Sequence, residues 1–260
     1  MRRVVVTGMG AVTPVGNHLE EYWNSISQGI CGIGPITRFD ASDKKVQIAA
    51  EVKGFDPTEY MEKSELRKND LFVQYAVAAA EQAMQDSGLA GTVAPERLGV
   101  YVGSGIGGIL TTTENSDKLC QGAKRVSPFM VPMMIVNMAS GTISIRTQAK
   151  GPTLPVVTAC ATSTHAIGEA FRAVKHGYAD AILAGGSEAA VCNLTLAGFT
   201  SCMALSTNND PATACRPFDK NRDGFVMGEG AGILVLEEYE HAKARGAKIY
   251  GEICGYGNTS

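Results

Sequence analysis

The chain has 260 residues, of which 45% are hydrophobic and 19% charged, so it holds enough apolar material for a large core. A formal net charge of −3 gives no basic excess, which argues against a nucleic-acid binder. The apolar run after Arg2 and Arg3 meets Thr7 and Gly8 before it could form a signal-peptide core, and is therefore expected to form a buried strand.

Short apolar runs alternate with alanine-rich or amphipathic stretches along the chain. We expect Asn17 to cap the first predicted helix and Gly88 to end the second. This alternation indicates a layered α/β fold. The predicted strands are 3–6, 46–52, 98–102, 155–158, 181–183, 233–236 and 248–254. The predicted helices are 19–27, 71–87, 163–175 and 238–244.

Two stretches without any charge, 126–145 and 189–209, reach the length of a membrane span. Both contain Asn, Ser, Thr and Gly, so we interpret them as interior or interface segments of a soluble protein. Residues 248–260 are predicted to form a strand that leads into a loop, with no closing helix. A domain rarely ends in this way, which indicates that the natural polypeptide continues.

Cysteine and histidine residues are scattered rather than clustered. The seven cysteines contain no C-x-x-C pair, and all except Cys160 are expected to be reduced and mostly buried. Of the four histidines only His165 falls near a plausible site. It follows Cys160 by five residues, more than one helical turn, which disfavours an imidazole–thiol pair. This spacing makes no zinc pattern, and His18, His176 and His241 are expected at the surface.

Two segments resemble ligand-binding loops but depart from them. Residues 103–108 fit G-x-G-x-x-G after a strand, yet no acidic residue ends a second strand about 20 residues later. We therefore expect a tight turn beside a pocket rather than a dinucleotide site. Residues 219–224 resemble the start of a calcium loop, but Glu229 stands eleventh where the bidentate glutamate should be twelfth. We expect these carboxylates to pair with Arg216 and Arg222.

The strongest candidate for chemistry is Cys160, in the segment VVTACATSTHAIG at 156–168. A β-rich run is followed by small residues and a predicted helix, which places the thiol at a strand-to-helix turn. Free backbone N–H groups and the positive end of the helix dipole favour a thiolate there. Such a thiolate can attack a thioester, and its own N–H can hold the developing oxyanion. On this spacing alone, a buried structural cysteine is equally open.

The same segment resembles the active-site signature of the β-ketoacyl-[acyl-carrier-protein] synthases of the thiolase-like superfamily. The resemblance is greatest to the elongating type II subclass of bacterial and organellar fatty-acid synthesis. It covers all 260 residues, but only the first part of the family. Similar motifs follow in order: RRVVVTGMGAVTPVGN at the start, GSGIGG at 103–108, SPFMVPMMIVNMASG at 127–141, AGGSEA at 184–189, and RPFDKNRDGFVMGEGAGILVLEEYEHAKARGAKIY at 216–250.

The resemblance implies a thiolase-like α/β fold, in which this chain forms the first αβα half of a duplicated αβαβα architecture. Residues 1–247 would be the N-terminal half that carries the nucleophile, and residues 248–260 the first strand of a truncated second half. The rest of the family carries two catalytic histidines, a supporting lysine and a second oxyanion loop. None of the histidines in this chain matches those motifs.

The resemblance also implies a cytoplasmic acyltransferase of fatty-acid biosynthesis and lipid metabolism, a homodimer when complete, with no nucleic-acid or membrane partner. Cys160 would take an acyl group from acyl-carrier protein. Malonyl-carrier protein would then lose carbon dioxide and condense with it to give a 3-oxoacyl product, without metal, nicotinamide or flavin. The implied acyl-pocket residues are Ile106, Met130 and Phe199. The implied docking residues for the acidic carrier protein are Lys63, Arg67, Lys68, Lys124 and Arg125, while Met203 stands where relatives often carry arginine.

Three other functions stay open at this point. The presence of Cys160 disfavours a non-catalytic chain-length partner, because partner subunits of the family replace it, but does not address an acyl-binding fragment. A degradative thiolase or a starter-type synthase would place its cysteine earlier and would lack the RPFD…RDGF segment. A dinucleotide-dependent enzyme would rest on residues 103–108 alone.

Overall fold

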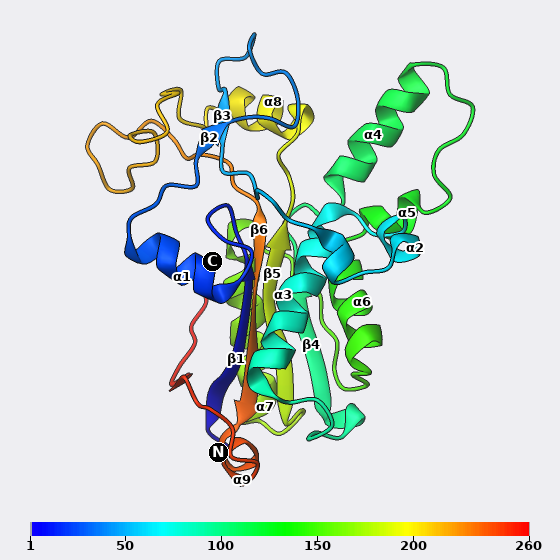
Figure 1. Ribbon diagram of the computed structural model, residues 1–260, viewed down its shortest axis with the longest axis vertical. Helices are drawn as coiled ribbons and strands as arrows, with labels where there is room; N and C mark the ends of the chain where they lie inside the picture. The colour runs from blue at the N-terminus through cyan, green and yellow to red at the C-terminus, as the bar shows by residue number, and fades with distance from the viewer. Residues whose placement is uncertain (1, 260) are drawn as a thin grey trace.

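A mixed five-stranded sheet runs through the centre of the computed structural model, which describes residues 2–259 (Figure 1). The strand order is β4-β5-β6-β1-β7. The pair β4–β5 is parallel, whereas β5–β6, β6–β1 and β1–β7 are antiparallel. The strands are β1 (Val4–Val12), β4 (Leu98–Gly103), β5 (Ala181–Glu188), β6 (Gly230–Glu238) and β7 (Gly251–Glu252), and a separate pair joins β2 (Gly34–Pro35) to β3 (Ile48–Ala49).

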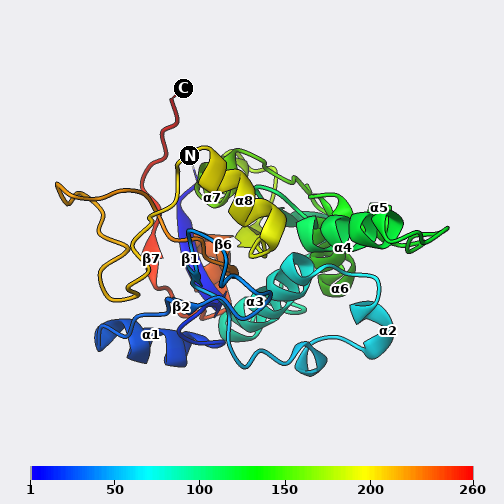
Figure 2. The same cartoon turned by 90° about the horizontal axis from the view of Figure 1, so that it is seen from above.

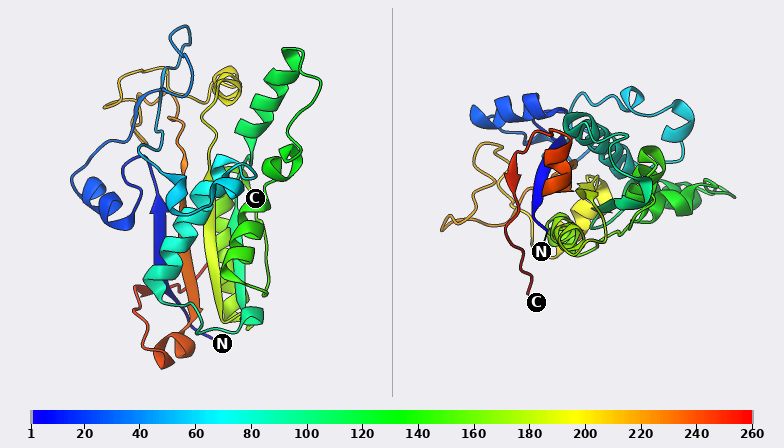
Figure 3. Two further views of the ribbon diagram at one scale, coloured as in Figure 1. Left: turned by 45° about the vertical axis from the view of Figure 1, so that its right-hand side comes forward. Right: turned by 90° about the horizontal axis from the view of Figure 1, so that it is seen from below.

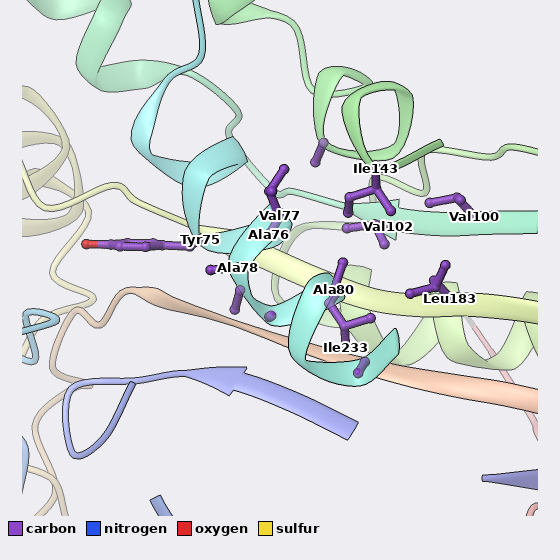
Figure 4. Close-up of a cluster of buried hydrophobic side chains, with 14 of the residues drawn as sticks. Tyr75, Ala76, Val77, Ala78, Ala80, Val100, Val102, Ile143, Leu183 and Ile233 are labelled. Carbon is purple, nitrogen blue, oxygen red and sulfur yellow. The ribbon is translucent and has the colours of Figure 1, made fainter. Parts of the chain in front are cut away.

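Helices cover both faces of the sheet. On one face α3 (Leu71–Ser87) and α6 (Met138–Thr147) pack on one set of strand side chains. Figure 4 shows part of this set, with Val102 and Leu183 under the two helices. The alternate strand residues, such as Ile182, face α7 (Thr162–Lys175) behind the sheet. Because successive strand side chains point to opposite faces, the apolar strands support two cores and an αβα sandwich.

The shorter helices gather mainly at one end of the sheet. Figures 1 and 3 show α4, α8 and the β2–β3 pair beyond the end at which β4 and β5 finish, while α9 lies at the opposite end. Figure 2 shows α4 and α5 on one side of the molecule and α1 on the other. These helices are α1 (Leu19–Ser27), α2 (Lys63–Leu66), α4 (Ile109–Cys120), α5 (Met130–Met134), α8 (Asn193–Ser201) and α9 (Tyr239–Ala244); three 3-10 turns span Pro57–Glu59, Pro95–Arg97 and Ala159–Ala161.

Two predicted helices have the expected bounds, 19–27 and 71–87, and Gly88 ends the second with a left-handed φ of 58°. The predicted cap Asn17 is wrong. His18 takes the N-cap position without a side-chain hydrogen bond, and the Asn17 amide instead donates to the Lys53 carbonyl. The cap was misplaced because that amide serves to tie two loops together.

The predicted strand at 155–158 is also wrong, because this segment is extended but forms no strand. Its upstream neighbours run beside β4 through a single bridge between Thr153 and Val100. Pro152 and Pro155 lack the N–H groups that a longer ladder would need. The predicted strands 46–52 and 248–254 shrink to Ile48–Ala49 and Gly251–Glu252, since each meets only two partner residues.

The surface differs from expectation for several titratable residues. Cys192 is the one buried cysteine in the described part of the chain, and the other six are exposed free thiols, so the expectation of mostly buried cysteines is wrong. These thiols lie largely on loops and helix ends, outside both cores. His241 is partly buried and contacts the Glu237 carboxylate at 2.6 Å, rather than lying free at the surface. No helix within residues 2–259 is long and apolar enough to cross a membrane.

Candidate active site

Cys160 occupies the 3-10 turn Ala159–Ala161, directly before α7. The Ala161 N–H donates to the Thr158 carbonyl at 3.0 Å, and the Thr162 N–H closes the turn on Ala159. Ala159 has a φ of 49°, a left-handed conformation that costs energy for a residue with a side chain. The strained turn places an exposed thiol at the positive end of a 14-residue helix. An extended segment thus replaces the predicted strand, but the cysteine does precede a helix.

Two glycines let this turn approach the end of the sheet. A Cβ atom on Gly103 would lie 2.0 Å from the Val156 carbonyl oxygen and 2.5 Å from the Thr162 methyl carbon. A Cβ atom on Gly186 would lie 3.0 Å from the Cβ of Ser163. Neighbouring strands β4 and β5 therefore carry glycine at paired positions, because the nucleophile turn packs against their backbones.

The Cys160 turn opens into a cavity of about 660 Å³. Its wall includes Ile106 from the turn after β4 and Phe199 from α8, which meets Phe225 edge to face with ring centroids 5.4 Å apart. Cavities of this size and apolar lining are typical of sites for small molecules or chains. The fold therefore brings three predicted site residues, Cys160, Ile106 and Phe199, to one cavity, although they are distant in sequence.

The other predicted site residues lie outside this cavity, and so does His165, for which no site role was predicted. Met130 starts α5 and is half-buried, and it does not line the cavity wall. His165 lies in the first turn of α7 with its ring 6.2 Å from that of Tyr256. The five docking residues are all exposed; they are Lys63, Arg67, Lys68, Lys124 and Arg125.

Two carboxylates in the cavity wall, Glu229 and the partly buried Glu188, were not predicted. The Glu229 side chain is fully buried, pairs with Arg38, and accepts hydrogen bonds from the Val52 N–H at 2.9 Å and the Tyr75 hydroxyl at 3.2 Å. Burial and the Glu229 charge raise the pKa of Tyr75, which keeps the phenol protonated as a donor. Glu188 ends β5 and accepts from Ser104 and Gly105. The only sequence signal was an acidic residue within a small, uncharged run, in GGSEA and GEGAG.

The calcium-like segment forms an internally bonded loop. Asp223 accepts hydrogen bonds from the Ser206 hydroxyl at 2.6 Å and the Thr207 N–H at 2.9 Å, and lies 3.6 Å from Arg216 as predicted. Arg222, however, donates to the main-chain oxygen of Asp219, not to its carboxylate. Within residues 2–259 no three His, Cys, Asp or Glu side chains cluster as metal ligands would.

These features define an αβα protein with a cysteine at a helix N-terminus that faces an apolar cavity. Residues 1–242 match the family described as "Beta-ketoacyl synthase, N-terminal domain". The chain belongs to this family, and the thiolase-like half fold predicted from the sequence is confirmed.

Individual relatives agree with this assignment. A protein from Synechocystis named 3-oxoacyl-[acyl-carrier-protein] synthase 2 is 53% identical over 99% of this chain, and the chain spans 63% of that relative's length. A β-ketoacyl synthase crystal structure from Burkholderia phymatum is 36% identical with a TM-score of 0.88, over 98% of this chain and 64% of its own. A type II PKS ketosynthase solved with its acyl-carrier protein and bound to the hexaketide is 33% identical with a TM-score of 0.85. The match covers 98% of this chain and 62% of that ketosynthase chain.

Proposed function

We propose that the polypeptide carrying this chain is a 3-oxoacyl-[acyl-carrier-protein] synthase of fatty-acid biosynthesis, with Cys160 as the acyl acceptor. The observation that carries the proposal is the position of the thiol: exposed, at the N-terminus of α7, in the wall of an apolar cavity. The identity to the Synechocystis relative supports the choice of reaction.

The chemistry at Cys160 is acyl transfer between thioesters. The thiolate attacks the carbonyl carbon of the acyl thioester, a new carbon–sulfur bond forms, and the carrier thiolate leaves and takes a proton. Thr162 and Ala161 use their N–H groups to close the 3-10 turn, whereas the Cys160 N–H can point at the developing oxyanion. The acyl chain would extend between Ile106 and Phe199.

Condensation needs catalytic groups that do not line the described cavity of this chain. Decarboxylation of malonyl-carrier protein requires groups that stabilise a carbanion and its enolate oxygen, and no histidine lines the described cavity. We expect the 260-residue chain, incubated with acyl-carrier protein, to gain the mass of one acyl group, and with malonyl-carrier protein to form no 3-oxoacyl product. Intact mass spectrometry measures the acyl adduct, and product chromatography measures the 3-oxoacyl product. A robust yield of 3-oxoacyl product from this chain alone would contradict the expectation that it supports acylation but not condensation.

The exposed basic residues support a docking surface for an acidic carrier protein. Lys68 places its ammonium group 5.6 Å from the centre of the Phe129 ring, which joins the α2 segment to the loop that carries Lys124 and Arg125. Within residues 2–259 none of these cations has an ion-pair partner, so their charge is available to a partner. Met203 is 86% exposed and would offer the partner an apolar side chain in place of arginine.

Reversal of charge at Arg67 and Lys68 tests the docking surface. The double variant Arg67→Glu/Lys68→Glu should weaken acyl-carrier protein binding roughly tenfold at low salt, and less as salt is added. The matched control Lys150→Glu/Lys243→Glu makes the same charge change at exposed positions elsewhere. Titration by fluorescence anisotropy at two ionic strengths gives both affinities. Equal losses in the two variants would show a general charge effect and remove the docking claim.

The proposal includes a homodimer and a cytoplasmic location. Exposed apolar side chains, which a second copy would cover, lie on or near α5, α6 and the extended segment after it. A reducing compartment suits a chain whose described cysteines are all free. The exposed apolar residues are Phe129, Val131, Ile135, Ile145, Leu154 and Val157.

A further inference from the structure

A carboxylate from a neighbouring strand holds the glycine-rich turn after β4. Glu188 Oε1 accepts a hydrogen bond from the Ser104 hydroxyl at 2.9 Å, and its Oε2 accepts from the Gly105 N–H at 2.8 Å. The Ser104 oxygen in turn accepts from the Gly107 N–H at 2.8 Å. The backbone is therefore fixed on both sides of Ile106.

This arrangement explains why the G-x-G-x-x-G pattern does not indicate a phosphate site. In a dinucleotide-binding loop, backbone N–H groups face the phosphates. Here the N–H groups of Gly105 and Gly107 are already occupied by Glu188, directly or through Ser104. A Cβ atom on Gly105 would lie 2.9 Å from Glu188 Oε2 and 3.4 Å from the Ala159 oxygen, so the turn fits tightly between the carboxylate and the nucleophile turn.

Even partial burial of the Glu188 carboxylate is costly. Desolvation raises the pKa of this carboxyl group against the opposing hydrogen bonds, and no cation pairs with it among residues 2–259. By contrast, the other carboxylate of the cavity, Glu229, is fully buried and has Arg38 as its partner. The cost at Glu188 is offset by the contacts it makes, and those contacts all serve one turn.

The turn after β4 forms part of the cavity wall through Ile106. Ile106 is 38% exposed, so its position depends on the backbone that bears it more than on surrounding side chains. Ile106, Glu188 and Cys160 line the same cavity. We propose that Glu188 is a positioning residue that holds Ile106 against the cavity and thereby sets which acyl chain lengths Cys160 accepts. The inference rests on the proposed acyl transfer.

Glu188→Gln tests this role with little change in shape. The amide keeps one oxygen, but its NH₂ group cannot accept from the Gly105 N–H. We expect the ratio of Cys160 acylation rates for long and short saturated acyl donors to change roughly tenfold. Ser104→Ala, which removes the Ser104 contacts with Glu188 and Gly107 but keeps the hydrogen bond from the Gly105 N–H to Glu188, should change the same ratio by a smaller factor. The acylation rate for each donor is measured separately, by following intact mass against time in the polypeptide that carries this chain.

The outcomes separate a positioning role from a structural one. If Glu188→Gln slows all donors by one common factor, or leaves the ratio unchanged, the inference is wrong. Glu51→Gln serves as the matched control, since it alters a buried carboxylate that accepts from the Thr37 N–H and hydroxyl outside the cavity wall, and it should leave the ratio as it is. If Glu188→Gln does not fold, the Ser104→Ala ratio decides the question.

A second readout does not depend on acylation. Backbone amide exchange over residues 104–107 should be faster in Glu188→Gln than in the unaltered protein, because the single amide oxygen cannot accept from both the Gly105 N–H and the Ser104 hydroxyl. Unchanged exchange overturns the inference on its own. If the unaltered protein accepts no acyl donor at all, the proposed function fails, and the exchange measurement still shows whether Glu188 holds the turn.

Discussion

Cys160→Ala should eliminate acyl transfer to the protein while leaving its stability almost unchanged. The side chain is exposed and packs in neither core, so we expect a change in unfolding free energy within about 0.5 kcal/mol. Removal of a nucleophile, in contrast, typically lowers the rate by roughly 10⁴-fold or more. Intact mass after incubation with an acyl donor, together with a thermal melt, measures both effects.

The matched control for this experiment is another exposed cysteine. Cys120 ends α4 and does not line the cavity. Cys120→Ala should therefore keep the full acyl adduct. The comparison tests the local environment, since both residues are accessible thiols and only Cys160 has a helix N-terminus behind it and an apolar cavity beside it. An adduct that persists in Cys160→Ala and disappears in Cys120→Ala would show that Cys120, and not Cys160, is the acyl acceptor.

The main helices and strands around the two cores were predicted from the sequence, because hydrophobic periodicity and end signals act locally. The helix 71–87 is alanine-rich and ends at a glycine that can adopt positive φ. The predicted strands 98–102, 181–183 and 233–236 correspond to β4, β5 and β6. The predicted ranges are shorter than the observed strands at β5 and β6. Most of the residues missed in β5 and β6 are glycine or other small residues, whose strand character comes from pairing with neighbours rather than from their own preferences.

Several helices were missed for a related reason. α4 contains three consecutive threonines, and α6 contains Ser, Gly and Thr, which favour helix weakly. α6 is nevertheless stable because Ala139 and Ile143 pack in the core with α3 and β4, as Figure 4 shows for Ile143. Such helices depend on tertiary contacts that a single sequence does not display.

The candidate site divides in the same way. Cys160 could be proposed from its own neighbours, since a cysteine among small residues before a helix has a local chemical meaning. Ile106 and Phe199 required the family resemblance, because nothing in their own segments indicates a shared cavity. Glu188 was missed altogether. Its role depends on the pairing of β5 with β4, which brings residues 84 apart in sequence into hydrogen-bond contact.

The second large effect concerns a buried carboxylate far from the cavity. Glu237 on β6 is fully buried, and Arg245 just after α9 donates to both its oxygens at 2.7 Å. Thr7 and His241 complete the set at 2.7 and 2.6 Å. The cluster ties the end of β6 to β1 and α9. Removing the Arg245 cation leaves the buried Glu237 charge with only the Thr7 hydroxyl and the His241 imidazole beside it.

Arg245→Ala should destabilise the fold by about 3–5 kcal/mol, the usual cost when one partner of a buried ion pair is removed. Urea unfolding at neutral pH measures it. Lys118→Ala is the matched control, because the Lys118–Glu114 pair is exposed on both sides and should contribute less than about 1 kcal/mol. Similar losses in the two variants would mean that the Glu237 pair contributes no more than a surface pair.

The pH dependence of this difference distinguishes a charge effect from lost packing. Burial alone would raise the pKa of Glu237, but hydrogen bonds from Arg245, Thr7 and His241 outweigh it and hold the pKa below the ordinary 4.5. A carboxyl group with a lowered folded-state pKa contributes stability above its unfolded pKa and loses that contribution as pH falls through the folded value. The gap between the unaltered protein and Arg245→Ala should therefore be largest at neutral pH and shrink in acid, where a protonated Glu237 no longer needs a cation. A gap that stays constant with pH would assign the loss to the packing of the arginine side chain.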